Sequence, residues 1–144
     1  MTRYSVFTKD LLKKNLTDIM NEVSNFEYNN WREENYLIDL PDKWKFSIGI
    51  FTDDFLSGFS FNSNKVNIFY IHFFYIFKQF RGGGIGKNLL NNCEKISIDN
   101  GIKTMQLKCH KNNTDALNFY FENKFYIKNI SLQNDNYYLM EKKL

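Results

Sequence analysis

Apolar residues change their spacing several times along the chain, and each change predicts a different element. A short strand is expected at residues 3–7. From Thr8 to Asn25 apolar residues recur every three or four positions, which predicts an amphipathic helix with Thr8 as its N-cap. A shorter helix is expected over residues 31–40, because Pro41 cannot continue it.

The middle of the chain is rich in aromatic and β-branched residues, which favour strands. Strands are expected at residues 44–51, 55–61 and 66–77. Two polar segments, residues 52–54 and 62–65, have the composition of turns. Three consecutive strands joined by short turns form an antiparallel meander.

The helical period returns after Gly84, and Asn100-Gly101 has the composition of a helix C-cap. The remaining expected elements are a strand at 103–110, a helix at 114–123 and strands at 125–130 and 137–141. The fold class is therefore α/β of the α+β type, a mixed sheet with helices on its faces. With 144 residues and no linker or repeat, one domain over residues 1–144 is expected.

Composition and charge exclude several classes of protein. The hydrophobic share of 43% is enough for a packed core, which argues against disorder. The net charge is +3 and basic residues are scattered, so no nucleic-acid partner is expected. No apolar run is long enough to span a bilayer, so no membrane partner is expected either. Cys93 and Cys109 lie in apolar sequence without metal-ligand spacing, which indicates reduced thiols in a cytoplasmic protein and no metal site.

The most informative segment is residues 77–87, where a long apolar strand enters a cluster of glycines and an amphipathic helix follows at once. Glycine is needed where the backbone approaches a ligand closely, and the free N–H groups of a helix N-terminus bind anions such as phosphate. The Walker pattern fails because Asn88 follows Lys87. The dinucleotide pattern G-x-G-x-x-G is not met by Gly82, Gly84 and Gly86.

The pattern that fits is Arg/Gln-x-x-Gly-x-Gly/Ala, from Arg81 to Gly86. A second pattern, Asn-x-x-Ala-x-x-x-Tyr-x-x-x-Gly-Phe, is matched at Asn113, Ala116, Tyr120 and Phe125. On these two motifs, residues 70–125 resemble the GNAT superfamily of N-acetyltransferases. Lys124 replaces the glycine of the second motif, so the preceding helix is expected to end through Asn123 in a left-handed turn.

The resemblance implies a mostly antiparallel sheet of six or seven strands, splayed between the fourth and fifth strands, with about four helices. It implies acetyl-CoA as the cosubstrate, with its pantetheine arm in the gap against main-chain groups of Phe74, Tyr75 and Ile76. Asn113 would contact the thioester end, and Arg81 and Lys87 would add positive charge near the phosphates. The pyrophosphate would rest on the amides of Gly82, Gly83, Gly84, Ile85, Gly86 and Lys87.

The resemblance also suggests catalytic residues. Tyr120 matches the position of the general acid that protonates the leaving thiolate, and a main-chain N–H near Ile76 would polarise the carbonyl. His72 shares strand parity with Phe74 and Ile76 and is the candidate general base. A water placed by Tyr70, or His110, are the alternatives.

The acceptor is less clear from sequence. Residues 25–34 and 39–44 combine Trp, Tyr, Asn and acidic groups that suit a small amine, such as an amino sugar or a nucleotide-linked amino sugar. The alternatives are a protein N-terminus or lysine, and a non-catalytic acetyl-CoA-binding module. Lys108 stands where N-terminal acetyltransferases often have Glu, which weighs against that subclass. The strand at 137–141 is expected at a sheet edge, where it could pair in a homodimer.

Overall fold

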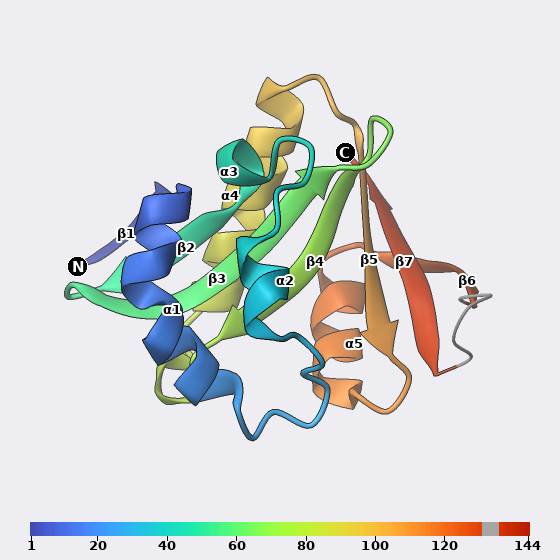
Figure 1. The fold of residues 1–144 in the computed structure, drawn as a ribbon. Coiled ribbons are helices and arrows are strands. Elements are labelled where there is room, and N and C mark those ends of the chain that lie inside the picture. The colour runs from blue at the N-terminus through green and yellow to red at the C-terminus, as the bar shows by residue number, and fades with distance from the viewer. Residues whose placement is uncertain (131–135) are drawn as a thin grey trace.

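A computed structural model describes residues 1–130 and 136–144, which form one seven-stranded sheet with helices on both faces (Figure 1). The strand order is β1-β2-β3-β4-β5-β7-β6. Every neighbouring pair is antiparallel except β4 and β5, which are parallel. The strands are β1 (Thr2–Val6), β2 (Ile48–Thr52), β3 (Phe55–Asn64), β4 (Phe69–Ile76), β5 (Thr104–His110), β6 (Tyr126–Ile130) and β7 (Tyr137–Lys143). The helices are α1 (Lys9–Val23), α2 (Glu33–Leu37), α3 (Lys43–Phe46), α4 (Ile85–Asp99), α5 (Thr114–Glu122) and a 3-10 turn at Lys78–Phe80.

Residues predicted from sequence to begin and end helices do so in the structure. Thr8 caps α1, accepting a hydrogen bond from the N–H of Leu11 at 3.1 Å. Gly101 follows α4 with a φ of 73°, in the left-handed region that a C-cap glycine provides. The fold class predicted from sequence, a mixed and mostly antiparallel sheet with helices on its faces, is confirmed.

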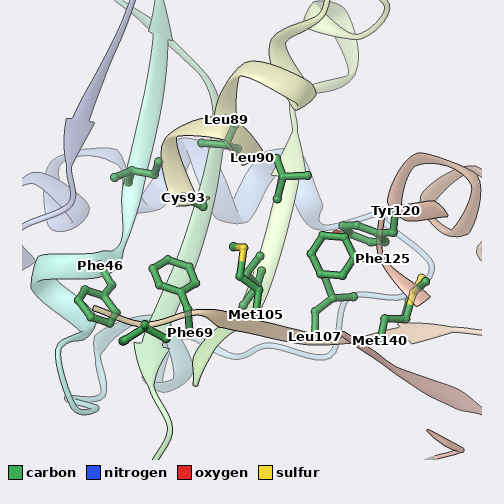
Figure 2. Close-up of a cluster of buried hydrophobic side chains, with 14 of the residues drawn as sticks. Phe46, Phe69, Leu89, Leu90, Cys93, Met105, Leu107, Tyr120, Phe125 and Met140 are labelled. Carbon is green, nitrogen blue, oxygen red and sulfur yellow. The ribbon is translucent and has the colours of Figure 1, made fainter. Parts of the chain in front are cut away.

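Each face of the sheet carries its own hydrophobic cluster. On one face, α1 and α2 cover an aromatic cluster that includes Phe7, Phe59 and Phe61. On the opposite face, α4 and α5 pack on the larger cluster shown in Figure 2. There Leu89, Leu90 and Cys93 of α4 lie over the sheet, and Tyr120 packs beside Phe125 and Met140. A buried leucine-sized side chain contributes about 1.5–3 kcal/mol, so these clusters fix the helix positions.

The sheet opens between β4 and β5, as the resemblance implied. Only three residue pairs join the two strands, Phe69 to Met105, Tyr70 to Gln106 and Ile71 to Leu107. Beyond Ile71, β4 continues to pair with β3 while its other edge separates from β5, a divergence visible in Figure 1. The unpaired edge of residues 73–76 is therefore free to receive a ligand on its main-chain groups.

The strand predicted at 44–51 begins later than expected. Residues 43–46 form the short helix α3, after Asp42 in a left-handed conformation with a φ of 60°. Lys43 is buried, and its Nζ donates to the carbonyl oxygens of Asn35, Tyr36 and Ile38. These tertiary bonds tie α2 to α3 and override the strand propensity of the aromatic residues.

Two other local expectations are also corrected. The turn predicted at 62–65 falls instead at Val66-Asn67, where both residues have positive φ, because β3 extends to Asn64. At the end of α5 it is Lys124, with a φ of 73°, that adopts the left-handed conformation, and Asn123 stays at −98°. Lys124 thus takes the conformation that the motif's glycine would supply.

The strand at the chain end is not at an edge. β7 is bonded to β5 on one side and to β6 on the other, and β1 and β6 form the sheet edges. The expected pairing of residues 137–141 in a homodimer is therefore wrong, because that strand has no free edge. No helix in the described part of the chain is both long and apolar enough to cross a membrane.

A β-bulge at His72 changes which face the later residues of β4 point to. Phe61 pairs with Phe73 while Asn62 pairs with Ile71, so His72 is an extra residue in β4. Phe69 and Ile71 belong to the α4 side, but Phe73 and Tyr75 belong to the α1 side. The shared parity of His72 with Phe74 and Ile76 therefore does not place them on one face. His72 lies beside Tyr70, with ring centroids 4.8 Å apart, and Phe74 packs on Tyr120.

Candidate functional site

Two adjoining cavities occupy the gap between β4 and β5. The larger, of about 720 Å³, extends along the edge of β4 to the glycine loop and the N-terminus of α4. The smaller, of about 470 Å³, lies between the loop that follows α1 and the ends of β5 and β7. We call them the loop cavity and the front cavity. Both volumes lie in the range of about 300–1,000 Å³ typical of small-ligand sites.

The glycine loop has the conformation that the sequence required. Gly82 and Gly84 have φ values of 88° and 80°, which side chains rarely adopt. A Cβ atom added at either glycine would meet no atom within 4 Å, so the glycines leave open space beside the backbone. Gly84 is the N-cap of α4, and the first hydrogen bond of the helix runs from the N–H of Asn88 to its carbonyl. The amides of residues 85–87 precede that bond and are available to an anion.

Positive charge is held beside this loop. The Nε of Arg81 donates to the carbonyl of Ile76 at 2.9 Å, and its guanidinium lies 5.0 Å from the ring centroid of Tyr75. Glu22 of α1 accepts from the hydroxyl of Tyr75 and from the N–H of Lys78, at 3.0 and 2.9 Å. The loop is therefore attached to α1 as well as to β4. Lys87 also lines the loop cavity, on the first turn of α4.

Residues of α5 lie where the cavities meet. Tyr120 and Asn113 line both of them, as does Phe74 of β4. The Tyr120 ring packs against Phe74, Phe119 and Phe125 at centroid distances of 6.2, 5.4 and 5.4 Å. Burial in this apolar setting, with smaller contributions from the two cysteines, raises the pKa of Tyr120 well above its ordinary value. Its hydroxyl therefore stays protonated at neutral pH.

Asn113 caps α5, and its side-chain oxygen accepts from the N–H of Ala116 at 3.3 Å. The helix N-terminus fixes the side chain at the cavity junction. This gives the second sequence motif a physical explanation, since its Asn begins the helix and its Tyr lies seven residues later on the same helix.

The front cavity contains His72 in a hydrogen-bonded setting. Its Nε2 lies 2.6 Å from the Oγ of the buried Ser63, on the neighbouring strand. Burial, followed by the charges of Lys43 and Lys65, lowers the pKa of His72 to about 4. The neighbouring Tyr70 has its pKa raised to about 12 by burial. At neutral pH both groups are therefore uncharged.

The loop between α1 and α2 forms another wall of the front cavity. Asn29 holds it, accepting from the N–H of Trp31 at 3.0 Å and donating to the carbonyl of Val23 at 3.3 Å. Trp31 packs edge-on against Phe73 of β4. Opposite, His110 at the end of β5 lies between the rings of Tyr28 and Tyr137, with centroids 4.8 and 5.0 Å away.

Most of the residues predicted from sequence line these cavities. The loop cavity contacts Phe74, Tyr75, Ile76, Arg81, Gly82, Gly84, Ile85, Gly86, Lys87, Asn113 and Tyr120. His72 lines the front cavity, and Gly83 lines neither of the two. Sequence reasoning missed Tyr137, since nothing in the local pattern of β7 points to a site, and Phe119, which the periodicity marks only as an apolar helix residue.

The loop cavity fits a long ligand with a phosphate-bearing end, such as coenzyme A. Open space beside Gly82 and Gly84, free amides on α4 and the charges of Arg81 and Lys87 suit the pyrophosphate. The unpaired edge of β4 suits an amide-containing arm. No group of three or more His, Cys, Asp or Glu that could hold a metal ion occurs among residues 1–130 and 136–144.

Several solved structures share this fold, and some of them are N-acetyltransferases. The chain superimposes on the PaiA N-acetyltransferase of Thermoplasma acidophilum, solved with coenzyme A, with a TM-score of 0.79 and 21% identity over 100% of this chain and 99% of that one. For Ard1 of Thermoplasma volcanium the TM-score is 0.83 and the identity is 17%, over 99% of this chain and 97% of that one. For Arabidopsis thaliana Naa50, solved with the bisubstrate analogue CoA-Ac-MVNAL, the TM-score is 0.76 and the identity is 20%, over 99% of both chains.

The sequence comparison identifies the family. The family model described as acetyltransferase (GNAT) family matches residues 16–125, more than half of the chain. The chain therefore belongs to the acetyltransferase (GNAT) family and is an N-acetyltransferase that uses acetyl-CoA. No curated protein sequence matches it.

Proposed function

We propose that the protein transfers the acetyl group of acetyl-CoA to the primary amine of a small molecule, with an amino sugar or nucleotide-linked amino sugar among the candidates. The observation that carries the proposal is the position of Tyr120, a residue that lines both cavities. The donor would occupy the loop cavity and the amine the front cavity, so a proton donor lies where they meet. Two buried free cysteines support a reducing, cytoplasmic location.

When bound, acetyl-CoA supplies an acetyl group activated as a thioester. The glycine-loop amides, with Arg81 and Lys87, hold the phosphates, and the free edge of β4 from Phe74 to Ile76 aligns the arm. Asn113 fixes the end nearest to Tyr120. As the amine nitrogen bonds to the acetyl carbon and the carbon–sulfur bond breaks, the Tyr120 hydroxyl gives its proton to the departing sulfur, and the proton that the nitrogen loses on becoming an amide restores the hydroxyl through water. Holding both reactants in adjoining cavities supplies much of the rate enhancement.

The amine must also lose a proton. A pKa of about 4 makes His72 a weak base for an ammonium group. Its neutral ring, fixed by Ser63, is better suited to accept a hydrogen bond from the acceptor or from a water molecule beside Tyr70. We therefore assign His72 to orienting the amine and propose that the ammonium proton leaves to solvent through water.

A peptide N-terminus is the second candidate acceptor. The observation that favours it is the likeness, over 99% of both chains, to Arabidopsis thaliana Naa50 solved with a bisubstrate analogue that contains the peptide MVNAL. The two candidates make different demands, since a peptide needs an open groove for several residues and a small amine needs only the front cavity.

The test is calorimetric titration with acetyl-CoA, followed by a thiol-release screen of amino sugars, small amines and peptides. Micromolar binding and turnover on a small amine would support the proposal. Turnover on peptides alone would favour the second candidate, and binding without turnover on any amine would indicate a non-catalytic acetyl-CoA-binding module.

A further inference from the structure

The two cavities differ in the charge of their walls. The loop cavity is lined by Glu27, Asp115 and Glu122 as well as by its two cations. Among the described residues that line the front cavity, Lys108 is the one permanent charge and no carboxylate is present. A wall of this kind disfavours a second positive charge on the acceptor and favours a negative one.

Lys108 is free to bind a ligand. It lies in β5 between Leu107 and Cys109, which also line the front cavity, and its register partner on β7 is Leu139. Its side chain is exposed and makes no ion pair with any residue in the described ranges. An unpaired ammonium group at a cavity wall can bind a carboxylate or phosphate without first breaking an internal bond.

A carboxylate on the strand beside Lys108, that of Glu141 in β7, is already occupied. Glu141 pairs in register with Gln106, two residues before Lys108 on β5. Burial by itself would raise the pKa of Glu141, but hydrogen bonds from Tyr126, Gln106 and Lys128 outweigh it and lower the pKa to about 2. Since Glu141 is buried and saturated with donors, it leaves the charge of Lys108 available to the cavity.

A second donor lies on the same strand. The Nδ1 of His110 accepts from the N–H of Asn112 at 3.1 Å, so the proton of the neutral ring is on Nε2. Tyr28 and Tyr137 hold the ring between them. His110 has the same strand parity as Lys108, and both line the front cavity.

We infer that the acceptor is a small amine that also carries an anionic group, a carboxylate or a phosphate, and that Lys108 with His110 binds that group. The inference rests on the proposed function. It assigns the two ends of the front cavity different tasks: Tyr120 lies at the reacting end, and Lys108 selects the acceptor by charge. Simple di- and polyamines, whose second group is cationic, would be excluded.

The test compares acceptors that share an amine but differ in charge. Glucosamine is paired with glucosamine 6-phosphate, ethanolamine is paired with β-alanine, and 1,3-diaminopropane is the cationic probe. We expect kcat/KM for the anionic member of at least one pair to exceed that of its neutral partner by about 10- to 100-fold, the range of a charge-assisted hydrogen bond. The pair that shows the preference distinguishes phosphate from carboxylate.

Lys108→Met should abolish this preference by raising KM for the anionic acceptor, with kcat and the Kd of acetyl-CoA unchanged. Lys108→Glu should reverse it in favour of 1,3-diaminopropane. Lys111→Met is the matched control, since Lys111 lies near the ring of Tyr138 and lines neither cavity.

If kcat/KM were the same for the neutral and anionic acceptors of every pair, the inference would be overturned and the proposed function would stand. The same conclusion would follow if Lys108→Met lowered kcat/KM equally for both kinds of acceptor. Absence of thiol release with every small amine, by a protein that binds acetyl-CoA, would overturn the proposed function itself.

Discussion

The loop cavity and the front cavity are built in different ways. The loop cavity takes most of its wall from two continuous segments, residues 74–87 and 112–123, and the first of these offers main-chain groups at the glycine loop and at the free edge of β4. The front cavity is assembled from the loop after α1, the middle of β4, the ends of β5 and β7, and α5, and it presents side chains. A main-chain site depends on a local conformation that few sequences allow, whereas a side-chain site depends on how distant segments pack. The first can be recognised along the sequence and the second cannot.

The strongest test removes the element that the two cavities share. Tyr120→Phe deletes one oxygen atom and keeps the ring contacts with Phe74, Phe119 and Phe125. We expect kcat to fall by about 10²- to 10⁴-fold, the usual contribution of a general acid, with the Kd of acetyl-CoA nearly unchanged. Tyr4→Phe, at an exposed position on β1, is the matched control. Unchanged turnover would remove the assigned role from Tyr120.

The second test damages the front cavity alone. Lys43→Met leaves the carbonyls of Asn35, Tyr36 and Ile38 without their donor, and we expect a loss of about 3 kcal/mol in the free energy of unfolding. Because α2 begins two residues after Trp31, which lines the front cavity, KM for the acceptor should rise while the Kd of acetyl-CoA stays constant. Urea unfolding and calorimetry measure the two effects.

Lys45→Met, two residues along the same helix and exposed, should change neither quantity. If Lys43→Met weakened acetyl-CoA binding as much as acceptor binding, the two cavities would not be separable in this way.

The third test uses pH to examine the bulge in β4. The folded-state pKa of His72, about 4, lies below its ordinary value of 6.5. The unfolded chain therefore binds more protons in this window, and stability is complete above pH 6.5 and lost as the pH falls towards 4. We expect His72 to account for a loss of about 2 kcal/mol at pH 5. Urea unfolding of the wild type and of His72→Asn at pH 7 and pH 5 isolates the contribution of His72 to the pH dependence of stability, because the two proteins share every other titratable group. Equal pH dependence of the two proteins would contradict the burial of a neutral His72.

The smallest expected effect comes from the loop cavity. Gly84→Val places a side chain at a φ of 80°, which distorts the start of α4. We expect the Kd of acetyl-CoA to rise about tenfold, equivalent to about 1.4 kcal/mol. Gly101→Val imposes similar backbone strain at the other end of α4, with a φ of 73° and open space around it. It should lower stability without changing the Kd, so equal losses of affinity would indicate a folding defect instead of a binding defect.

These differences also explain how far the sequence could predict the molecule. Thr8, Gly84 and Gly101 act on their own neighbours, so the helices that they bound were predicted correctly. Lys43 acts on carbonyls up to eight residues away, and the aromatic sequence around it reads locally as a strand. Val66 adopts a left-handed conformation that its propensity opposes, because the pairing of β3 with β4 continues to Asn64.

The candidate site follows the same rule. Arg81, the glycines and Tyr120 were found through motifs whose spacing is local. The contact of Phe74 with Tyr120, and the position of Tyr137 beside His110, arise from strands and a helix that meet only in the folded chain. The face to which His72 points could not be read from parity, because nothing in the sequence marks the bulge.

That bulge makes one residue of β4 dispensable to the facing of the others. Ile71 lies on the α4 side and Phe73 on the α1 side, so deleting His72 would make them neighbours in a simply alternating strand. Phe73 and Tyr75 would stay on one side of the sheet and Phe74 and Ile76 on the other, so the edge offered to the cosubstrate would keep its side chains. A one-residue insertion between Ile71 and Phe73 would need a second extra residue in the bulge; without it, the outer half of the strand would turn over. β4 is therefore expected to tolerate the loss of a residue at this point better than the gain of one.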